Sequence, residues 1–249
     1  MSGHSKWSTI KRKKGAADAR RSKLFSKLVK DITIAVKEGG NDPDANPRLR
    51  LAITNAKGVS MPKDNILRAI KKGEDNDSNN YEELTYEGYA PHGIAIFLEC
   101  TTDNTHRTIA NVRALFNKYN GSLGKNGSLS FIFDRKGIFN FPLGEKDEEE
   151  LELELIDAGA EEMYLEEGQL HITTAMEDFG KMMKKLEELE IEPESAELQR
   201  LPVNTEKLDV QTSIKVLKMI DAFEEDEDVA NVYHNLEMTP ELEEALSNE

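Results

Sequence analysis

The chain has 249 residues, of which 38% are apolar and 32% charged, and its formal net charge is −16. This length allows one large domain or two to three small ones, and the apolar share is too high for a wholly disordered chain. The longest apolar run, residues 94–98, is too short to span a membrane, and no secretory signal is visible. The single cysteine, Cys100, excludes an internal disulfide and fits a reducing compartment, so we expect a cytoplasmic protein.

The overall charge hides a strong asymmetry. Residues 1–72 contain 18 Lys/Arg and 6 Asp/Glu, whereas residues 73–249 contain 14 Lys/Arg and 42 Asp/Glu. The first region therefore carries a formal charge of +12 and the remainder a charge of −28. Such a division indicates a basic module that binds a polyanion and is carried on an acidic body.

Apolar periodicity predicts a small helical bundle in the basic region, with helices over residues 23–37, 47–57 and 62–73. The second helix has Asn46 as its N-cap, Pro47 at its first position and Gly58 just past its end. Residues 74–80 are polar and rich in turn formers, so we place a domain boundary there.

After this linker the period becomes strand-like. We predict strands over residues 86–89, 93–100, 129–133 and 229–235, and helices over residues 105–119 and 210–223. Asp103 or Asn104 would cap the first of these helices. Pro240 is suited to start a short helix near the C-terminus.

The intervening segment has its own order of elements. It reads as strand 138–141, helix 149–158, strands 163–165 and 169–173, helix 176–189 and strand 196–201. This is the ferredoxin-like order, which closes one small sheet covered by two helices. We therefore predict an α+β fold of three domains: an N-terminal helical bundle (1–79), a discontinuous middle α/β domain (80–134 and 203–249) and an inserted ferredoxin-like α/β domain (135–202).

The basic region concentrates its cations on one helix face and in the arm that precedes it. The helix cations Arg20, Lys23, Lys27, Lys30 and Lys37 lie opposite its apolar face, as the 3.6-residue period requires. Cations neutralise phosphates, and an aromatic ring stacks on unpaired bases. The candidate nucleic-acid contacts are Lys6, Trp7, Lys11, Arg12, Lys13, Lys14, Arg20, Arg21, Lys23, Lys27, Lys30 and Lys37.

Two other interpretations of this region stay open. A solvated helix face with a basic tail is the ordinary alternative, although such faces usually mix both signs of charge. The turn at residues 58–61 has helix-turn-helix length and would present Lys63, Asn65 and Arg68 to a groove, but an ordinary helical hairpin is commoner.

Patterns for catalysis or metal binding are weak. The five histidines are scattered, and residues 75–86 lack the Gly and Glu of a calcium loop. Residues 121–127 are glycine-rich without the phosphate-loop pattern, although Lys125 leaves open a minor contact to phosphate. Asp103, Asn104, His106 and Arg107 look most catalytic, yet they sit where an N-cap belongs. We therefore predict no enzyme activity, no cofactor, no metal and no small-molecule substrate.

Several long sequence blocks resemble the YebC family. The blocks are Gly3–Trp7, Ile10–Lys14, Asn46–Arg50, Met61–Ile66, Tyr86–Tyr89, Thr102–Asn104, Arg107–Thr108, Gly121–Ser128 and Arg135–Gly137. Two positions depart from the usual pattern. Ala90–Gly93 stands where a glycine-richer turn is usual, and Asn120 stands where a second glycine is common.

The resemblance implies three domains, no catalytic residues and no cofactor. Bacterial members are described as DNA-binding transcriptional regulators, whereas mitochondrial relatives look like translational activators and some bacterial members act at stalled ribosomes. We expect a regulator of gene expression whose partner is DNA or ribosomal RNA, with the ribosome as an alternative and no membrane. An enzyme acting on a nucleotide, or an adaptor whose basic arm binds an acidic protein, would be a different class of function.

Overall fold

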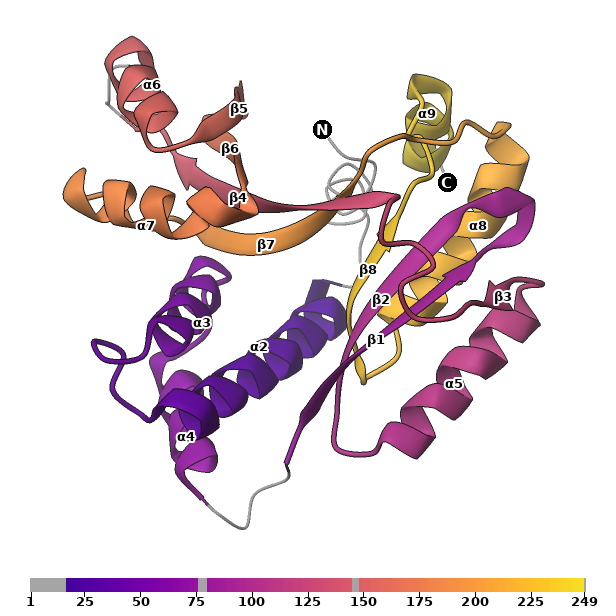
Figure 1. Ribbon diagram of the computed structural model, residues 1–249, viewed down its shortest axis with the longest axis horizontal. Coiled ribbons are helices and arrows are strands. Elements are labelled where there is room, and N and C mark those ends of the chain that lie inside the picture. The colour runs from indigo at the N-terminus through magenta and orange to yellow at the C-terminus, as the bar shows by residue number, and fades with distance from the viewer. Residues whose placement is uncertain (1–16, 76–79, 145–147, 249) are drawn as a thin grey trace. The chain divides into compact units, whose positions relative to one another are not determined.

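The computed structural model describes residues 17–75, 80–144 and 148–248. The chain divides into two compact units. Unit 1 contains the described residues up to Lys27 together with residues 79–134 and 201–249, and unit 2 contains residues 28–78 and 135–200. Each unit combines helices with a four-stranded sheet (Figure 1). In the described ranges no helix combines the length and the apolar character that crossing a membrane requires.

The helices are α2 (Ala17–Gly39), α3 (Pro47–Gly58), α4 (Lys63–Glu74), α5 (Thr105–Lys118), α6 (Glu148–Asp157), α7 (Phe179–Glu188), α8 (Val210–Glu224) and α9 (Pro240–Asn248). The strands are β1 (Glu82–Tyr89), β2 (Ala95–Thr102), β3 (Ser122–Leu123), β4 (Phe133–Pro142), β5 (Ala160–Glu166), β6 (Gln169–Ala175), β7 (Ser195–Pro202) and β8 (Val229–His234). The α+β class is confirmed, while the three domain boundaries stay predictions.

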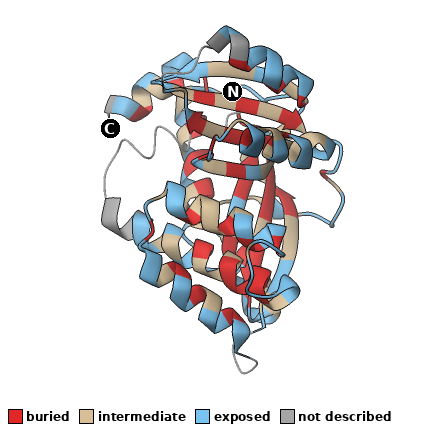
Figure 2. Cartoon of the chain, turned by 90° about the vertical axis from the view of Figure 1, so that its left-hand side faces the viewer, coloured by how far each residue is buried: buried red, intermediate tan, exposed pale blue. Residues whose placement is uncertain are grey.

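The sheet of unit 1 has the order β3-β1-β2-β8, with antiparallel pairing throughout. Strand β2 is buried on both faces, which explains why its sequence is almost continuously apolar. On one face, Ile96 and Leu98 of β2 share a core with Phe116 of α5 and Phe223 of α8. On the other face, Phe97 belongs to a smaller cluster formed with loop and strand residues. Figure 2 colours the buried residues of the chain red.

The predicted strand over residues 129–133 is wrong. Residues 126–132 form consecutive turns, and β4 begins only at Phe133. Leu129 is apolar because it is buried in the cluster with Phe97 and Tyr233, although it belongs to no strand. A short apolar run can belong to a loop that packs on the face of a sheet. Its sequence pattern alone does not distinguish it from a strand.

The sheet of unit 2 has the order β5-β6-β4-β7. Numbered along this segment, the strand order is 2-3-1-4, which is the ferredoxin-like arrangement predicted from the sequence. Helices α6 and α7 bury Leu155, Met182 and Leu186 in one core with Phe139 and Phe141 of β4. The predicted helix at residues 176–189 starts with a short 3-10 turn at Met176–Asp178 before α7 begins.

The helices of the basic region also pack in unit 2. Gly73 of α4 lies so close to α2 that an added Cβ would stand 2.6 Å from the Cβ of Val36. The side chain of Asn55 in α3 forms two hydrogen bonds with the backbone of Ala196 in β7, at 3.0 and 2.9 Å. The helical bundle is therefore joined to the ferredoxin-like sheet through α3.

The turn between α2 and α3 depends on the buried side chain of Asn46. Its Oδ1 accepts the backbone N–H of Leu49 at 3.1 Å, which confirms the predicted N-cap. Its Nδ2 donates to the carbonyl oxygens of Ala35 at 2.7 Å and Gly40 at 2.8 Å. One side-chain amide therefore supplies hydrogen-bond partners for backbone groups at both the start of α3 and the end of α2.

We expect Asn46→Ala to lower the free energy of unfolding by about 2 kcal/mol, because buried polar groups at both helix ends lose their partner. The urea midpoint by circular dichroism measures this loss. Asp44→Ala, at an exposed position of the same turn, is the control and should stay within about 0.5 kcal/mol of the wild type. Equal midpoints for the two variants would contradict this role of Asn46.

Candidate nucleic-acid interface

Helix α2 carries the part of the predicted basic surface that the structure describes. The arm residues Lys6, Trp7, Lys11, Arg12, Lys13 and Lys14 lie outside the described residues, and the side chain of Arg20 is also not described. The five remaining candidates are on α2, exposed or half-buried: Arg21, Lys23, Lys27, Lys30 and Lys37. The apolar side of the same helix is buried, with Leu28, Ile32 and Val36 in the interior.

Lys27 and Arg21 illustrate that cations of this set also have contacts within the protein. The Nζ of Lys27 donates a hydrogen bond to the backbone carbonyl of Ala230 at 2.9 Å. The guanidinium of Arg21 lies over the ring of Phe25, 5.3 Å from its centroid. Lys27 therefore helps to hold the first part of α2 against the strand β8, a role that the helical wheel did not indicate. The nucleic-acid role of the whole set stays a prediction.

The hairpin of α3 and α4 keeps several polar side chains on its surface. Lys63 and Arg68 are exposed and Asn65 is half-buried on α4. At the C-terminal end of α3, Lys57 is not left to solvent alone. Its Nζ forms an ion pair with Glu192 at 2.7 Å. An added Cβ on Gly58 would overlap the carbonyl oxygen of Glu194. The end of α3 is thus packed against the segment that leads into β7.

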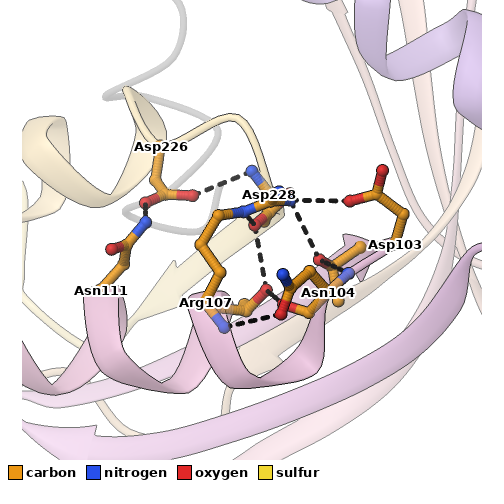
Figure 3. A network of polar contacts seen from close by, with 8 residues as sticks. Asp103, Asn104, Arg107, Asn111, Asp226 and Asp228 are labelled. Atoms are coloured by element: carbon orange, nitrogen blue, oxygen red, sulfur yellow. Dashed lines mark hydrogen bonds and ion pairs between the residues drawn. The ribbon is translucent and has the colours of Figure 1, made fainter.

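A polar network joins the start of α5 to the loop before β8 (Figure 3). The Nε and Nη2 of Arg107 contact Oδ2 and Oδ1 of Asp228 at 3.0 and 2.8 Å, a two-pronged ion pair. Arg107 also contacts Asp103 at 2.9 Å, and the hydroxyl of Thr108 donates to Asp228 at 3.0 Å. Asn104 caps α5 by accepting the backbone N–H of Arg107 at 3.0 Å.

This network has the properties of a structural clamp. The Asp228 side chain is 4% exposed, so its charge needs the partners that Arg107 and Thr108 provide. The two carboxylates, Asp228 first, hold the pKa of Arg107 above its usual value. His106, the only histidine of the predicted cluster, is exposed, and the hydrogen bonds of the network given above do not involve it. The prediction that this cluster caps a helix is confirmed for Asn104.

A second buried carboxylate, Glu87 of β1, organises the glycine-rich loop after β3. Its Oε1 accepts the N–H of Gly127 at 2.7 Å, and its Oε2 accepts the N–H of Leu129 at 2.6 Å. Its backbone carbonyl accepts the N–H of Gly124 at 2.7 Å. Sequence reasoning missed this role, because nothing local distinguishes Glu87 from the many exposed glutamates of the chain. No signal in the sequence alone separates it, since the same strand also carries Glu82 and Glu83.

Cys100 is buried in the core of unit 1, and burial, with Asp226 and Asp228 adding to it, raises its pKa to about 12. The thiolate is the reactive form, so we expect the folded protein to react with iodoacetamide at pH 8 at least about a hundredfold more slowly than the unfolded protein. Because the folded state disfavours the thiolate, stability should fall as the pH rises above the ordinary value of 9.0. Rapid labelling of the folded chain, followed by mass spectrometry, would contradict this environment.

Among the described residues, no group of three or more His, Cys, Asp or Glu side chains is placed to hold a metal ion. The weak calcium-like pattern after Asp75 lies partly outside those residues, because residues 76–79 are not described.

Comparison with known proteins gives this architecture a family. Residues 5–76 match the family model described as the TACO1/YebC protein N-terminal domain. Residues 81–236 match the model described as the TACO1/YebC second and third domain. The chain belongs to the TACO1/YebC family.

Individual members of the family are similar along almost their whole length. A protein of Amoebophilus asiaticus is 56% identical over 239 residues, which cover 95% of this chain and 98% of the relative. One from Geotalea uraniireducens is 50% identical over 242 residues, covering 97% and 98%. Both are named "Probable transcriptional regulatory protein". The crystal structure of the conserved hypothetical protein Aq1575 from Aquifex aeolicus has 43% identity and a TM-score of 0.78, covering 89% of this chain and 92% of that one.

The two positions at which this chain departs from the usual family pattern share one backbone property. His92 has a φ of 66° and Asn120 a φ of 57°, both in the left-handed region that favours glycine. Asn120 follows the end of α5, where asparagine is the commonest substitute for glycine. This chain therefore holds a left-handed backbone conformation at both places with a side chain present.

Proposed function

We propose that this protein is a non-enzymatic regulator of gene expression that binds nucleic acid through its basic N-terminal region, acts in the cytoplasm, and has DNA as its leading target. The observation that carries the proposal is the division of charge, +12 over residues 1–72 against −28 over the rest. The names of the bacterial relatives, "Probable transcriptional regulatory protein", favour the DNA version.

The division of charge predicts which residues contact the nucleic acid and how binding depends on salt. Each Lys or Arg that neutralises a phosphate releases condensed counterions, so affinity should come from the arm residues 6–14 and the cations of α2. Phosphates would repel most of the acidic surface. That surface should therefore face away from the nucleic acid or contact a basic protein. Binding should therefore weaken steeply as salt concentration rises.

A ribosome-binding translation factor is the second candidate. It is favoured by the same division of charge, because a ribosome offers both phosphates for the basic region and basic proteins for the acidic remainder. The exposed Lys63 and Arg68 of the α3–α4 hairpin would serve either target, since cations bind phosphates of DNA and RNA alike.

Catalysis on a nucleotide receives less support from the geometry. Arg107 is paired with both Asp103 and Asp228, and His106 is an exposed side chain outside these ion pairs. A binding protein should keep its nucleic-acid affinity after His106→Ala, whereas an enzyme built on this cluster should lose turnover.

The two binding functions can be separated with purified components. Immobilised protein is offered fragmented genomic DNA and, in parallel, intact ribosomes at physiological salt, and the retained material is sequenced or quantified. Enrichment of discrete DNA fragments supports the transcriptional version. Retention of ribosomes without DNA enrichment supports the translational version, and retention of neither contradicts the proposed function.

A further inference from the structure

Strand β5 lies at the edge of the four-stranded sheet of unit 2. In the order β5-β6-β4-β7 it has β6 as its one neighbour, so among the described strands none pairs with its other side. Helices α6 and α7 pack on one face of this sheet (Figure 1). From the side chains along β5 we propose that this free edge binds an extended, arginine-containing segment of a partner protein, which adds a strand to the sheet.

The core-facing side of β5 has an apolar residue that its own sheet leaves uncovered. Side chains alternate between the two faces of a strand, so Met163 and Leu165 lie on the same face. Met163 packs against the core that α6 and α7 cover, whereas Leu165 is 44% exposed. An apolar side chain on a strand added beside β5 would cover Leu165.

The opposite side of β5 presents an aromatic ring toward the free edge. Tyr164 pairs across from His171 of β6, and the two rings stack with their centroids 4.7 Å apart and an angle of 7° between their planes. His171 covers the side of the Tyr164 ring that faces β6, so the other side faces the free edge. Both residues are half-buried. A guanidinium group stacks favourably on such a ring, because it is planar and positively charged.

Two carboxylates lie on either side of the Tyr164 ring. Glu162 and Glu166 share its face of β5, since each is two positions away along the strand. Burial, with the charges of Glu166 and Glu162 adding to it, raises the pKa of Tyr164, so both carboxylates lie near its hydroxyl. Both are exposed, and no ion pair within the described ranges involves either of them. The ring and the two carboxylates together form a site for a cationic side chain.

The charge around this edge selects its occupant. Residues 148–170 contain ten Asp/Glu and no Lys/Arg, so they would repel the phosphates of a nucleic acid. Antiparallel pairing of β5 with a second copy of itself would place Glu162 opposite Glu166 of that copy, and like charges at such positions are destabilising. Acids on an edge strand protect against pairing with like strands, but they attract a basic one.

The bound segment alternates basic and apolar residues. Its arginine lies opposite Tyr164, on the free side of the ring, and the diagonal neighbours Glu162 and Glu166 are about 7–8 Å away, within the reach of a long side chain. The apolar residues on its other face cover Leu165. Backbone hydrogen bonds to β5 supply affinity, and the alternate side chains supply specificity.

This inference goes beyond the proposed function, because it concerns a protein partner and a sheet edge outside the basic region. The probe is a fluorescent peptide in which arginine and valine alternate over the seven-residue length of β5. Its binding to the full-length protein is measured by fluorescence anisotropy at physiological salt. A peptide of the same composition with its arginines grouped at one end controls for general attraction to an acidic protein. We expect the alternating peptide to bind at least about tenfold more tightly.

Reversing the two carboxylates tests the charged part of the site. Glu162→Lys with Glu166→Lys should weaken binding of the alternating peptide at least about tenfold, because two attractions become repulsions. Glu187→Lys with Glu194→Lys makes the same change in net charge at exposed positions of unit 2 and should stay within about twofold of the wild type. Unchanged urea midpoints show that the variants are folded. Equal affinities for the two variants would overturn the inference.

The ring is tested by two substitutions of Tyr164. Tyr164→Val keeps a residue that favours strands and removes the ring, so binding should weaken about threefold to fivefold. Tyr164→Phe keeps the ring and should bind within about twofold of the wild type. A loss in Tyr164→Phe as large as in Tyr164→Val would show that the stacking surface has no role in binding.

Two N-methylated peptides test whether the segment binds as a strand. Methyl groups on the arginine nitrogens or on the valine nitrogens remove the donors from opposite edges of an extended peptide. One edge alone pairs with β5, so one methylated peptide should bind like its parent and the other at least about tenfold more weakly. The same affinity for both peptides would overturn the added strand. A wild-type dimer in sedimentation velocity that Leu165→Arg dissociates would identify a second copy as the occupant, and would also overturn it.

Nucleic-acid binding separates this inference from the proposed function. The Glu162/Glu166 variant should bind labelled DNA and RNA as its Glu187/Glu194 control does. The variant with residues 11–14 changed to glutamate should bind the alternating peptide at least as tightly as the wild type. If the peptide binds as expected and nucleic acid does not bind at all, the proposed function is wrong and the β5 site stands. If nucleic acid binds and the two peptides do not differ, the proposed function stands and the β5 site is wrong.

Discussion

Replacing Asp228 with alanine should lower the free energy of unfolding by about 3 kcal/mol, because removing one member of a buried pair leaves its partners without compensation. Asp228 accepts hydrogen bonds from the Nε and Nη2 of Arg107 and from the hydroxyl of Thr108. These bonds join the loop before β8 to α5. After this substitution Arg107 still pairs with Asp103, and its side chain is 47% exposed. Water and Asp103 should therefore offset part of the loss. The measurement is a urea titration followed by circular dichroism.

The neighbouring exposed acid Glu225 provides the control for Asp228. Glu225→Ala should leave the urea midpoint within about 0.5 kcal/mol of the wild type, as surface changes usually do. Asp228→Asn should fall between the two, since it keeps the shape and loses the charge. A midpoint for Asp228→Ala equal to that of the wild type would show that the network contributes nothing to stability.

Changing Lys11, Arg12, Lys13 and Lys14 together to glutamate should weaken nucleic-acid binding by about a hundredfold or more near 0.1 M salt. Four lost phosphate contacts should also reduce the slope of log affinity against log salt by about 3.6 for duplex DNA and about 2.8 for a single strand. Fluorescence anisotropy over a salt series measures both quantities.

A variant with the same change in net charge tests whether position matters. It reverses Lys181, Lys184, Lys215 and Lys218, which are exposed on α7 and α8. This control should keep most of the affinity and of the salt slope. Equal losses in the two variants would mean that net charge alone governs binding, and the arm would then have no specific role.

Local chemistry was sufficient to predict most of the secondary structure. Asn46 and Pro47 located the start of α3, because a side-chain acceptor and a fixed φ act within a few residues of each other. The ferredoxin-like order also followed from the sequence, since alternating strand and helix periods determine the sequence of elements. The strand order β5-β6-β4-β7 then agrees with the ferredoxin-like arrangement.

Features that depend on distant partners could not be predicted. Arg107 and Asp228 are separated by 121 residues, and neither residue type indicates its partner. Glu87 acts on a loop about 40 residues away, and Lys27 binds a carbonyl 203 residues further along the chain. Each is a charged side chain whose surroundings come from the tertiary fold alone, so local sequence patterns do not indicate its partner.

The misplaced strand at residues 129–133 has the same cause. Leu129 and Phe133 are apolar because they cover one face of the sheet of unit 1, but Glu87 holds the backbone at Leu129, and the N–H of Ile132 bonds back to the Leu129 carbonyl in a turn. The excess of cations over residues 1–72 can be read without knowledge of the fold, and the nucleic-acid role that it indicates stays a prediction.

The central claim, that the basic N-terminal region binds nucleic acid, is tested most directly by crosslinking in cells followed by sequencing of the attached DNA and RNA. The wild type is compared with the variant in which residues 11–14 are glutamate. We predict enrichment of discrete chromosomal sites, or of ribosomal RNA if the protein acts in translation, and loss of that enrichment in the variant. No enrichment in the wild type, or equal crosslinking by the variant, would contradict the claim.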